Sequence, residues 1–266
     1  MVLAKLMGGL GNQMFQIAAA HALALRNGDE SKFDLGQCYT PAQGNKASKY
    51  RTNIFKKISD VGISVNYMNK LMYDDLDKIY KEVGFSYNEI PYTKDMFLIG
   101  YFQSEKYFLD FKGEIIDLFE IPNKELVNGF LEPLLAIGKP ITSVHIRRGD
   151  YLKHPDFHPV CSIEYYKKAM NEVGDSTFIF QSDDMLWVTE NFKGANIIYS
   201  PFNDEISDLT LMTMVHNNII ANSSFSWWGA YLNQNKEKKV IAPSQWFGPM
   251  GPKDTQDLIP KDWVVI

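Results

Sequence analysis

The chain has 266 residues, of which 45% are hydrophobic, and this is enough apolar material for a sizeable core and for two lobes. A net charge of −5 without a basic patch argues against a nucleic acid partner. No apolar run approaches the roughly 20 residues that a membrane span needs.

The first half begins with a strand, a tight turn and a helix. The segment "VLAKLM" predicts the strand, "GGLGN" the turn and "QMFQIAAAHALALRNG" an amphipathic helix that Gly28 ends. Polar sequence at 37–57 predicts a surface loop. A helix near 68–83, a strand at 96–101 and a helix at 104–119 complete this half.

The second half alternates between strands and helices. The predicted strands lie at 141–147, 177–181, 196–199, 218–221 and 239–242, and the predicted helices at 162–173, 184–192, 204–216 and 225–234. Short apolar strands alternating with helices are typical of a parallel sheet covered on both faces. We therefore expect an α/β fold, divided at "AIGKPI" into lobes at 1–138 and 139–266 with a cleft between them.

Unusual residues follow several of these strands. In open α/β sheets, ligands bind beyond the carboxyl ends of the strands. The segments in question are 8–13, 145–150, 182–184 and 222–226. These are the places where we expect a binding site.

The segment "ITSVHIRRGDY" ends an apolar strand in charge. Arg147 and Arg148 offer planar arrays of N–H donors that suit phosphate oxygens. Asp150 could orient one guanidinium or accept hydrogen bonds from a nucleotide base. The alternative is an ion-pair network that serves stability alone, but such a network is costly to place at a ligand edge.

The segment "NNIIANSSFSWWGAYL" predicts a strand, a hydroxyl-rich turn and a helix. Ser223 or Ser224 would cap the helix, and the N–H groups of its first turn would form an anion site. A cap alone would explain these serines, whereas the double arginine nearby favours a phosphate cradle. We expect Trp227 and Trp228 to pack the helix.

Two further strand ends carry polar groups. In "FIFQSDD", Asp183 and Asp184 either serve the start of a helix or read the N–H edge of guanine. In "GGLGNQM", Gly11 lets backbone approach a ligand, and Asn12 and Gln13 add hydrogen-bonding groups. Met14 stands where a dinucleotide fingerprint has its third glycine, which argues against a nicotinamide dehydrogenase.

Metal sites look poor in this sequence. His154 and His158 flank "PDF" and do not share a helix face, so a zinc site there is disfavoured. Asp75 and Asp77 form an Asp-x-Asp within a predicted amphipathic helix, where a solvated face is the simpler interpretation.

Five motifs together resemble the α1,2-fucosyltransferases of glycosyltransferase family 11. They are, in order, "GGLGNQMFQIAAAHALA", "GYFQSEKYF", "SVHIRRGDY", "FQSDD" and "NSSFSWWGAYL". The resemblance covers about residue 5 to about residue 247. The pattern at 145–150 is also similar to that of other GDP-fucose-dependent enzymes.

This resemblance implies a GT-B-like architecture of two Rossmann-like lobes, the first on the acceptor side and the second binding GDP-fucose. It implies inverting transfer of L-fucose from GDP-β-L-fucose to the 2-hydroxyl of a terminal β-galactoside, as in a galactoside 2-alpha-L-fucosyltransferase, without a metal or other cofactor. The partners are then GDP-fucose and a galactose-terminated glycan. With only two cysteines and no signal peptide, we expect a cytoplasmic enzyme.

The motifs and the resemblance together give the candidate site residues. The expected catalytic group is Arg147, His145, Asp150 and Asn12, and the expected substrate-binding group is Gly11, Gln13, Arg148, Asp183, Ser223, Ser224, Phe225 and Ser226. Arg147 would stabilise the departing diphosphate together with His145, Asp183 would contact guanine, and Asn12 would face the sugar–phosphate or the acceptor.

Two points stay open at the level of sequence. The general base that takes the acceptor proton could be Asp150, His154, Asp156 or Glu105, although a carboxylate paired with arginine makes a weak base. The activity could also use another linkage or acceptor, or the chain could be a noncatalytic protein that binds a nucleotide or glycan.

Overall fold

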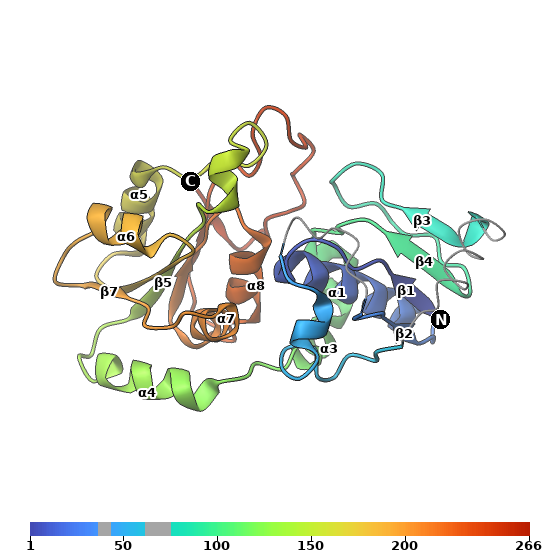
Figure 1. The fold of residues 1–266 in the computed structure, drawn as a ribbon, viewed down its shortest axis with the longest axis horizontal. Coiled ribbons are helices and arrows are strands. Elements are labelled where there is room, and N and C mark those ends of the chain that lie inside the picture. The colour runs from blue at the N-terminus through green and yellow to red at the C-terminus, as the bar shows by residue number, and fades with distance from the viewer. Residues whose placement is uncertain (37–43, 62–75) are drawn as a thin grey trace. The chain divides into compact units, whose positions relative to one another are not determined.

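The computed structural model describes residues 1–36, 44–61 and 76–266. It divides into two compact units (Figure 1). Unit 1 comprises Met1–Glu120 and Asp254–Pro260, and unit 2 comprises Ile121–Lys253 and Lys261–Ile266. The boundary expected at 138/139 therefore falls inside unit 2.

Unit 1 is built on a four-stranded sheet with the order β2-β1-β4-β3. Its strands are β1 (Val2–Ala4), β2 (Ser31–Lys32), β3 (Ile79–Lys81) and β4 (Met96–Ile99). Its helices are α1 (Leu10–Arg26), α3 (Lys112–Leu118) and the 3-10 helices Ala47–Tyr50, Leu76–Lys78, Glu105–Tyr107 and Leu109–Phe111. Gly28 adopts φ +63° just beyond α1, as its predicted role at the helix end requires.

Two predictions in unit 1 need correction. The helix expected near 68–83 lies outside the described residues up to 75, and the rest of it is a 3-10 turn followed by β3. Pairing of β3 with β4 takes precedence over the helical pattern of its sequence. The helix expected at 104–119 is α-helical only from Lys112 to Leu118.

Unit 2 is built on a six-stranded sheet with the order β10-β9-β8-β5-β6-β7, which is the Rossmann order. Its strands are β5 (Ile141–Ile146), β6 (Thr177–Ser182), β7 (Ile197–Tyr199), β8 (Asn217–Ile219), β9 (Val240–Ala242) and β10 (Val264–Val265). Its helices are α4 (Lys124–Leu135), α5 (Ile163–Val173), α6 (Met185–Asn191), α7 (Glu205–Met214), α8 (Ser224–Leu232) and the 3-10 helix Asp150–Lys153.

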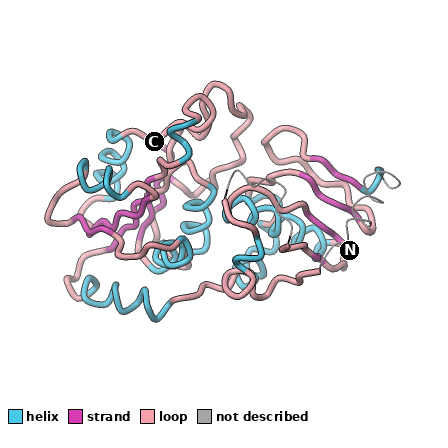
Figure 2. Tube along the Cα trace, in the orientation of Figure 1, coloured by secondary structure: helices cyan, strands magenta, loops and turns pink. Residues whose placement is uncertain are grey.

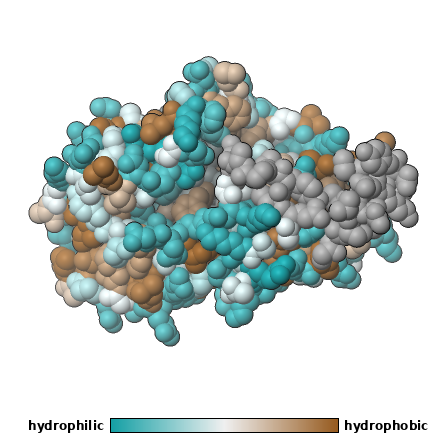
Figure 3. All heavy atoms as spheres, in the orientation of Figure 1, coloured by the Kyte–Doolittle hydropathy of each residue, from teal (hydrophilic) through white to brown (hydrophobic). Residues whose placement is uncertain are grey.

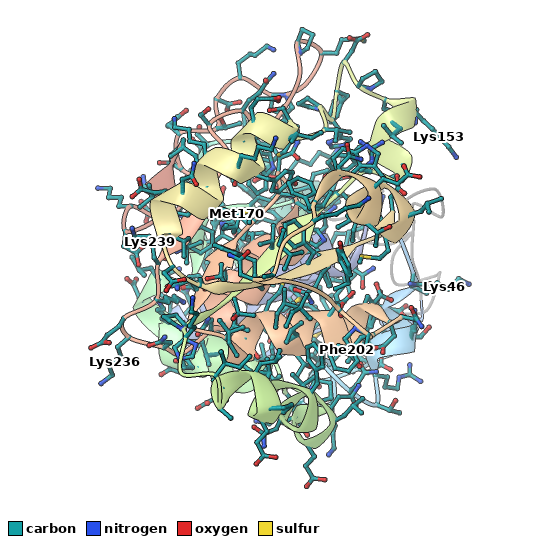
Figure 4. The ribbon with its side chains drawn as sticks, turned by 90° about the vertical axis from the view of Figure 1, so that its left-hand side faces the viewer. Lys46, Lys153, Met170, Phe202, Lys236 and Lys239 are labelled. Atoms are coloured by element: carbon teal, nitrogen blue, oxygen red, sulfur yellow. The ribbon has the colours of Figure 1, made fainter. Side chains whose placement is uncertain are left out.

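The core of unit 2 lies on both faces of its sheet. Val144 and Ile146 pack with α5 and α6 on one face, while Ile141 packs with α4 and α7 on the other. Figure 4 shows the two layers, with Met170 of α5 and Phe202 on opposite sides of the strands. Alternate residues of β5 therefore serve different faces, and His145 shares the α7 face with Ile141.

Every strand pair that the structure describes is parallel, so the predicted α/β class is confirmed (Figure 2). On the face drawn in Figure 3, hydrophilic atoms are interspersed with hydrophobic ones. Among the helices in the described ranges, none has both the length and the apolar character to cross a membrane.

Candidate active site

The candidate site of unit 2 lies where the order of the strands in its sheet reverses. From β5 the chain adds β6 and β7 on one side, and it then places β8, β9 and β10 on the other. The carboxyl ends of β5 and β8 are thus the switch point at which ligands bind in such sheets. The segments 145–151 and 222–225 meet there. The rings of His145 and Phe225 lie 5.5 Å apart, and the Tyr151 hydroxyl donates to the Asn222 carbonyl at 3.0 Å.

Arg147 is held by two carboxylates and an aromatic ring. Its Nη1 lies 2.8 Å from Asp183 Oδ2, its Nη2 donates to Asp150 Oδ1, and its Cζ lies 5.4 Å from the centre of the Tyr151 ring. The side chain still keeps 34% of its surface exposed. The two carboxylates and the Tyr151 ring therefore orient Arg147, and part of its side chain remains accessible to solvent.

Arg148 is held differently. Its Nε donates to Asp184 Oδ2 at 2.9 Å, and its Cζ lies 3.9 Å from the centre of the Trp187 ring. The guanidinium lowers the pKa of the Asp184 carboxyl, which also caps α6 by accepting from the Trp187 N–H. These contacts tie Arg148 to α6, and its expected role in substrate binding stays a prediction.

Asp183 lies beneath the turn that carries both arginines. It accepts from the Arg148 backbone N–H at 2.9 Å as well as from Arg147. A Cβ on Gly149 would come within 2.5 Å of Asp183 Oδ2, so the carboxylate lies directly against this glycine. Asp183 therefore positions Arg147 and the turn, and its expected contact with guanine stays a prediction.

His145 and Gln181 form a buried polar layer below the site. They are partners in the β5–β6 register, and His145 is only 6% exposed. Burial, with the charge of Arg147, lowers the pKa of His145 to about 3, so the imidazole is neutral. Within the described residues, His145 Nδ1 and Gln181 Oε1 have no hydrogen-bond partner. Such atoms are costly to bury unless a water or ligand satisfies them.

Asp208 of α7 supports this layer from the other end. It accepts from Gln181 Nε2 at 3.0 Å and from the Ser200 hydroxyl at 2.9 Å. Burial raises the pKa of Asp208 to about 6. Sequence patterns did not single out Gln181 or Asp208, since one lies within an apolar strand and the other in an ordinary first helical turn.

The serine-rich turn leads into α8 without a side-chain cap. Ser223 occupies the N-cap position, but its side chain accepts no capping hydrogen bond. Ser226 is fully buried and its hydroxyl bonds to the Ser223 carbonyl at 3.3 Å, whereas Ser224 and Phe225 are partly exposed. The helix start thus offers N–H groups to an anion. The full burial of both tryptophans, Trp227 and Trp228, agrees with the predicted packing role.

Unit 1 has its own switch point, between β1 and β4. Asn12 is partly exposed there, and its Oδ1 accepts from Gln103 Nε2 at 2.7 Å. Gln13 is fully buried, and its amide donates to the carbonyls of Gly8 and Asn45, both at 2.8 Å. Gln13 therefore shapes the turn, and Gly11 is buried in the first turn of α1 beside it.

The remaining candidates lie outside these clusters. His154 and Asp156 are exposed beyond the 3-10 helix, and Glu105 is partly exposed in unit 1. His158 stacks on Tyr151 with ring centres 4.6 Å apart. Asp75 lies outside the described residues. Within the described ranges, no three His, Cys, Asp or Glu side chains are grouped so that they could hold a metal.

Comparison with known proteins gives the family. The family described as Glycosyl transferase family 11 matches residues 1–266. The chain is 32% identical to the O-antigen biosynthesis glycosyltransferase WbnK of Escherichia coli, over 91% of this chain and 93% of that protein. It is also 32% identical to an alpha-1,2-colitosyltransferase of Escherichia coli, over 100% of this chain and 98% of that protein. It is 28% identical to galactoside alpha-(1,2)-fucosyltransferase 2 of Oryctolagus cuniculus, over 85% of this chain and 65% of that protein.

Among solved structures, the fucosyltransferase NodZ from Bradyrhizobium aligns with a TM-score of 0.47 and 14% identity, over 86% of this chain and 91% of that one. The match to the family extends over the whole chain, and two relatives above 30% identity match it almost end to end. The chain belongs to glycosyl transferase family 11.

Proposed function

We propose that the protein is a galactoside 2-alpha-L-fucosyltransferase that moves L-fucose from GDP-β-L-fucose to the 2-hydroxyl of a terminal β-galactoside, with inversion and without a metal. Relatives named for α1,2 transfer and for a galactoside acceptor support the linkage and the acceptor. The observation that carries the proposal is the oriented and accessible Arg147 at the switch point of unit 2. Unit 2 would bind the donor and unit 1 the acceptor.

The chemistry requires stabilisation of a leaving group. When the sugar–phosphate bond breaks, negative charge grows on the diphosphate, and fixed donors stabilise it best. An arginine has five N–H donors, and the two carboxylates beside Arg147 engage only part of this set. Because Asp150 and Asp183 offset its charge, the turn supplies orientation more than net positive charge. The N–H groups at the start of α8 would add to the phosphate contact.

The acceptor hydroxyl must give up a proton as it attacks. Asp150 accepts from the Arg147 guanidinium, so its position suits it to hold that arginine. The unpaired polar atoms of His145 and Gln181 would satisfy their hydrogen-bonding capacity on the bound nucleotide.

The test is acceptor-dependent release of GDP from GDP-fucose, with lactose as acceptor and EDTA present. The wild type is expected to release GDP, and Arg147→Ala to lose about 100- to 1,000-fold of the rate, the usual loss for one fixed donor. Arg26→Ala, which removes a surface ion pair with Asp110, is the matched control and should keep full activity. Dependence on a divalent ion would contradict the metal-free mechanism, and GDP binding without any transfer would indicate a binding protein.

A second donor deserves the same assay, because one of the relatives is named a colitosyltransferase. Colitose is fucose without its 3-hydroxyl, so a site that hydrogen-bonds this hydroxyl would reject colitose strongly. A higher kcat/KM with GDP-colitose than with GDP-fucose would replace the donor in our proposal and leave the role of Arg147 intact.

A further inference from the structure

Glu82 holds the turn that follows β4 in unit 1. It stands directly after β3, and its carboxylate accepts three hydrogen bonds from the N–H groups of Tyr101 and Phe102. The Tyr101 N–H lies 2.6 Å from Oε2, and the Phe102 N–H lies 3.0 Å from Oε1 and 3.1 Å from Oε2. Burial raises the pKa of the Glu82 carboxyl against these hydrogen bonds, which lower it. A carboxylate placed at this cost is held there by its partners.

The backbone of this turn is strained and closely packed. Phe102 adopts φ +52° although it is not glycine, and its side chain is fully buried. Its ring contacts Tyr107 edge-on with ring centres 5.3 Å apart. A Cβ on Gly100 would come within 2.7 Å of Glu82 Oε2, so only glycine admits the carboxylate at this position. Such a conformation persists when its surroundings determine it, and Glu82 is a large part of those surroundings.

The held turn ends in Gln103, which reaches Asn12. Gln103 is 7% exposed, and its Nε2 donates to Asn12 Oδ1 at 2.7 Å. This bond fixes which end of the Asn12 amide accepts and which end donates. A continuous series of contacts therefore runs from Glu82 through the backbone of residues 101–102 and the Gln103 amide to Asn12.

We propose that Glu82 is a positioning residue that fixes the orientation of Asn12 through Gln103 at the unit 1 switch point. The inference rests on the proposed function, in which unit 1 binds the acceptor, and on the expectation that Asn12 faces the sugar–phosphate or the acceptor. Loss of the carboxylate leaves two N–H groups without their acceptor, so the turn relaxes and Gln103 withdraws. A displacement of about 1 Å at a reacting group can cost on the order of 100-fold in rate.

Kinetics of Glu82→Ala, Asn12→Ala and the double variant test the proposal. Each single variant is expected to lower kcat by about 10- to 100-fold, and the double variant to be no slower than Asn12→Ala alone, because both changes remove one unit. Glu82→Gln keeps one carbonyl acceptor and is expected to regain most of the rate. GDP affinity, which belongs to unit 2, is expected to stay unchanged. Glu89→Ala, at an exposed acid of the same region, is the control.

The proposal would be overturned if the rate loss of the double variant equalled the product of the losses of the two single variants. A Glu82→Ala enzyme that is less stable but has the wild-type kcat would also overturn it. A second measurement needs no activity. The side-chain amide resonances of Asn12 are expected to shift in Glu82→Ala and to stay in place in Glu82→Gln, and unchanged resonances in both would refute the link. If the wild type transfers nothing from GDP-fucose, the function proposal fails while this measurement still decides the role of Glu82.

Discussion

Gly149 is the residue on which the orientation of Arg147 depends most directly. Its Cα lies against the carboxylate of Asp183, which in turn holds Nη1 of Arg147. Any larger residue must push this carboxylate aside. The carboxylate also accepts from the Arg148 N–H, so moving it costs hydrogen bonds as well as the orientation of Arg147.

Gly149→Ala is expected to affect activity more than stability. The added Cβ would displace Asp183 and release Arg147, so kcat/KM for transfer is expected to fall about 10- to 100-fold. The melting temperature is expected to change by no more than a few degrees. Gly129→Ala, in α4, is the control, because a Cβ there has no neighbour within 4 Å. Equal activity of the two variants would show that Asp183 does not position Arg147.

The sequence supports part of this site and misses the rest for a physical reason. Arg147 and Asp150 lie three positions apart, so their pairing is local and could be anticipated. The contact of Arg147 with Asp183 joins two strands, and it depends on the β5–β6 register that no local pattern specifies. Glu82 was hidden in a segment that resembles an amphipathic helix.

At the scale of elements, the buried carboxyl of Asp208 links α7 to β6. Asp208 accepts from Gln181 and Ser200, and burial raises its pKa to about 6. The folded state therefore binds a proton more tightly than the unfolded chain, whose aspartates titrate near about 4. The stability linked to this proton is fully present below about pH 4 and is lost as the pH rises through about 6.

Asp208→Asn is expected to remove this dependence. The difference in unfolding free energy between wild type and variant should change by roughly 2 to 3 kcal/mol between pH 4 and pH 7. The wild type becomes less stable relative to the variant as the pH rises. Urea unfolding at several pH values measures it, and Asp204→Asn at the N-cap of the same helix serves as the comparison. A difference that stays constant with pH would show that Asp208 keeps an ordinary pKa.

Elements were predictable where one structural period dominates. The strands β5 and β6 and the helices α5 and α6 lie within about two residues of their expected ends, because apolar strands alternate there with amphipathic helices. α4 was not anticipated, since it contains Pro133 and follows Asn123 in a left-handed conformation without a side-chain cap. The two-residue strands β2 and β10 exist only through pairing with their neighbours.

At the scale of the whole molecule, the late segment 254–260 belongs to unit 1 although its neighbours in sequence belong to unit 2. Asp254 accepts from the Phe85 and Ser86 N–H groups at 2.6 and 3.1 Å, and Asp257 accepts from the Tyr87 N–H at 3.0 Å. These bonds from N–H groups hold the pKa of Asp254 below its usual range. Composition could not reveal this assignment, because it depends on contacts between residues about 170 positions apart.

Leu258→Ala is expected to loosen unit 1 in particular. Leu258 is 1% exposed, and a leucine buried to this degree typically contributes 2 to 5 kcal/mol relative to alanine. Hydrogen exchange is expected to accelerate at the amides of β1 and β4 and to stay unchanged in β5 and β6. Val265→Ala, at a half-exposed position, controls for changes near the same end. Uniform acceleration in both units would mean that they unfold as one.

The path of the chain also has a consequence for synthesis on the ribosome. Domains made first usually fold first, while the rest of the protein is still being translated. Here the first 120 residues must wait for residues 254–260 to complete their unit, and unit 2 waits for its last strand, β10. Both units therefore reach their final form only after residues 254–266 have been made, and a nascent chain stopped at residue 253 would carry two incomplete units.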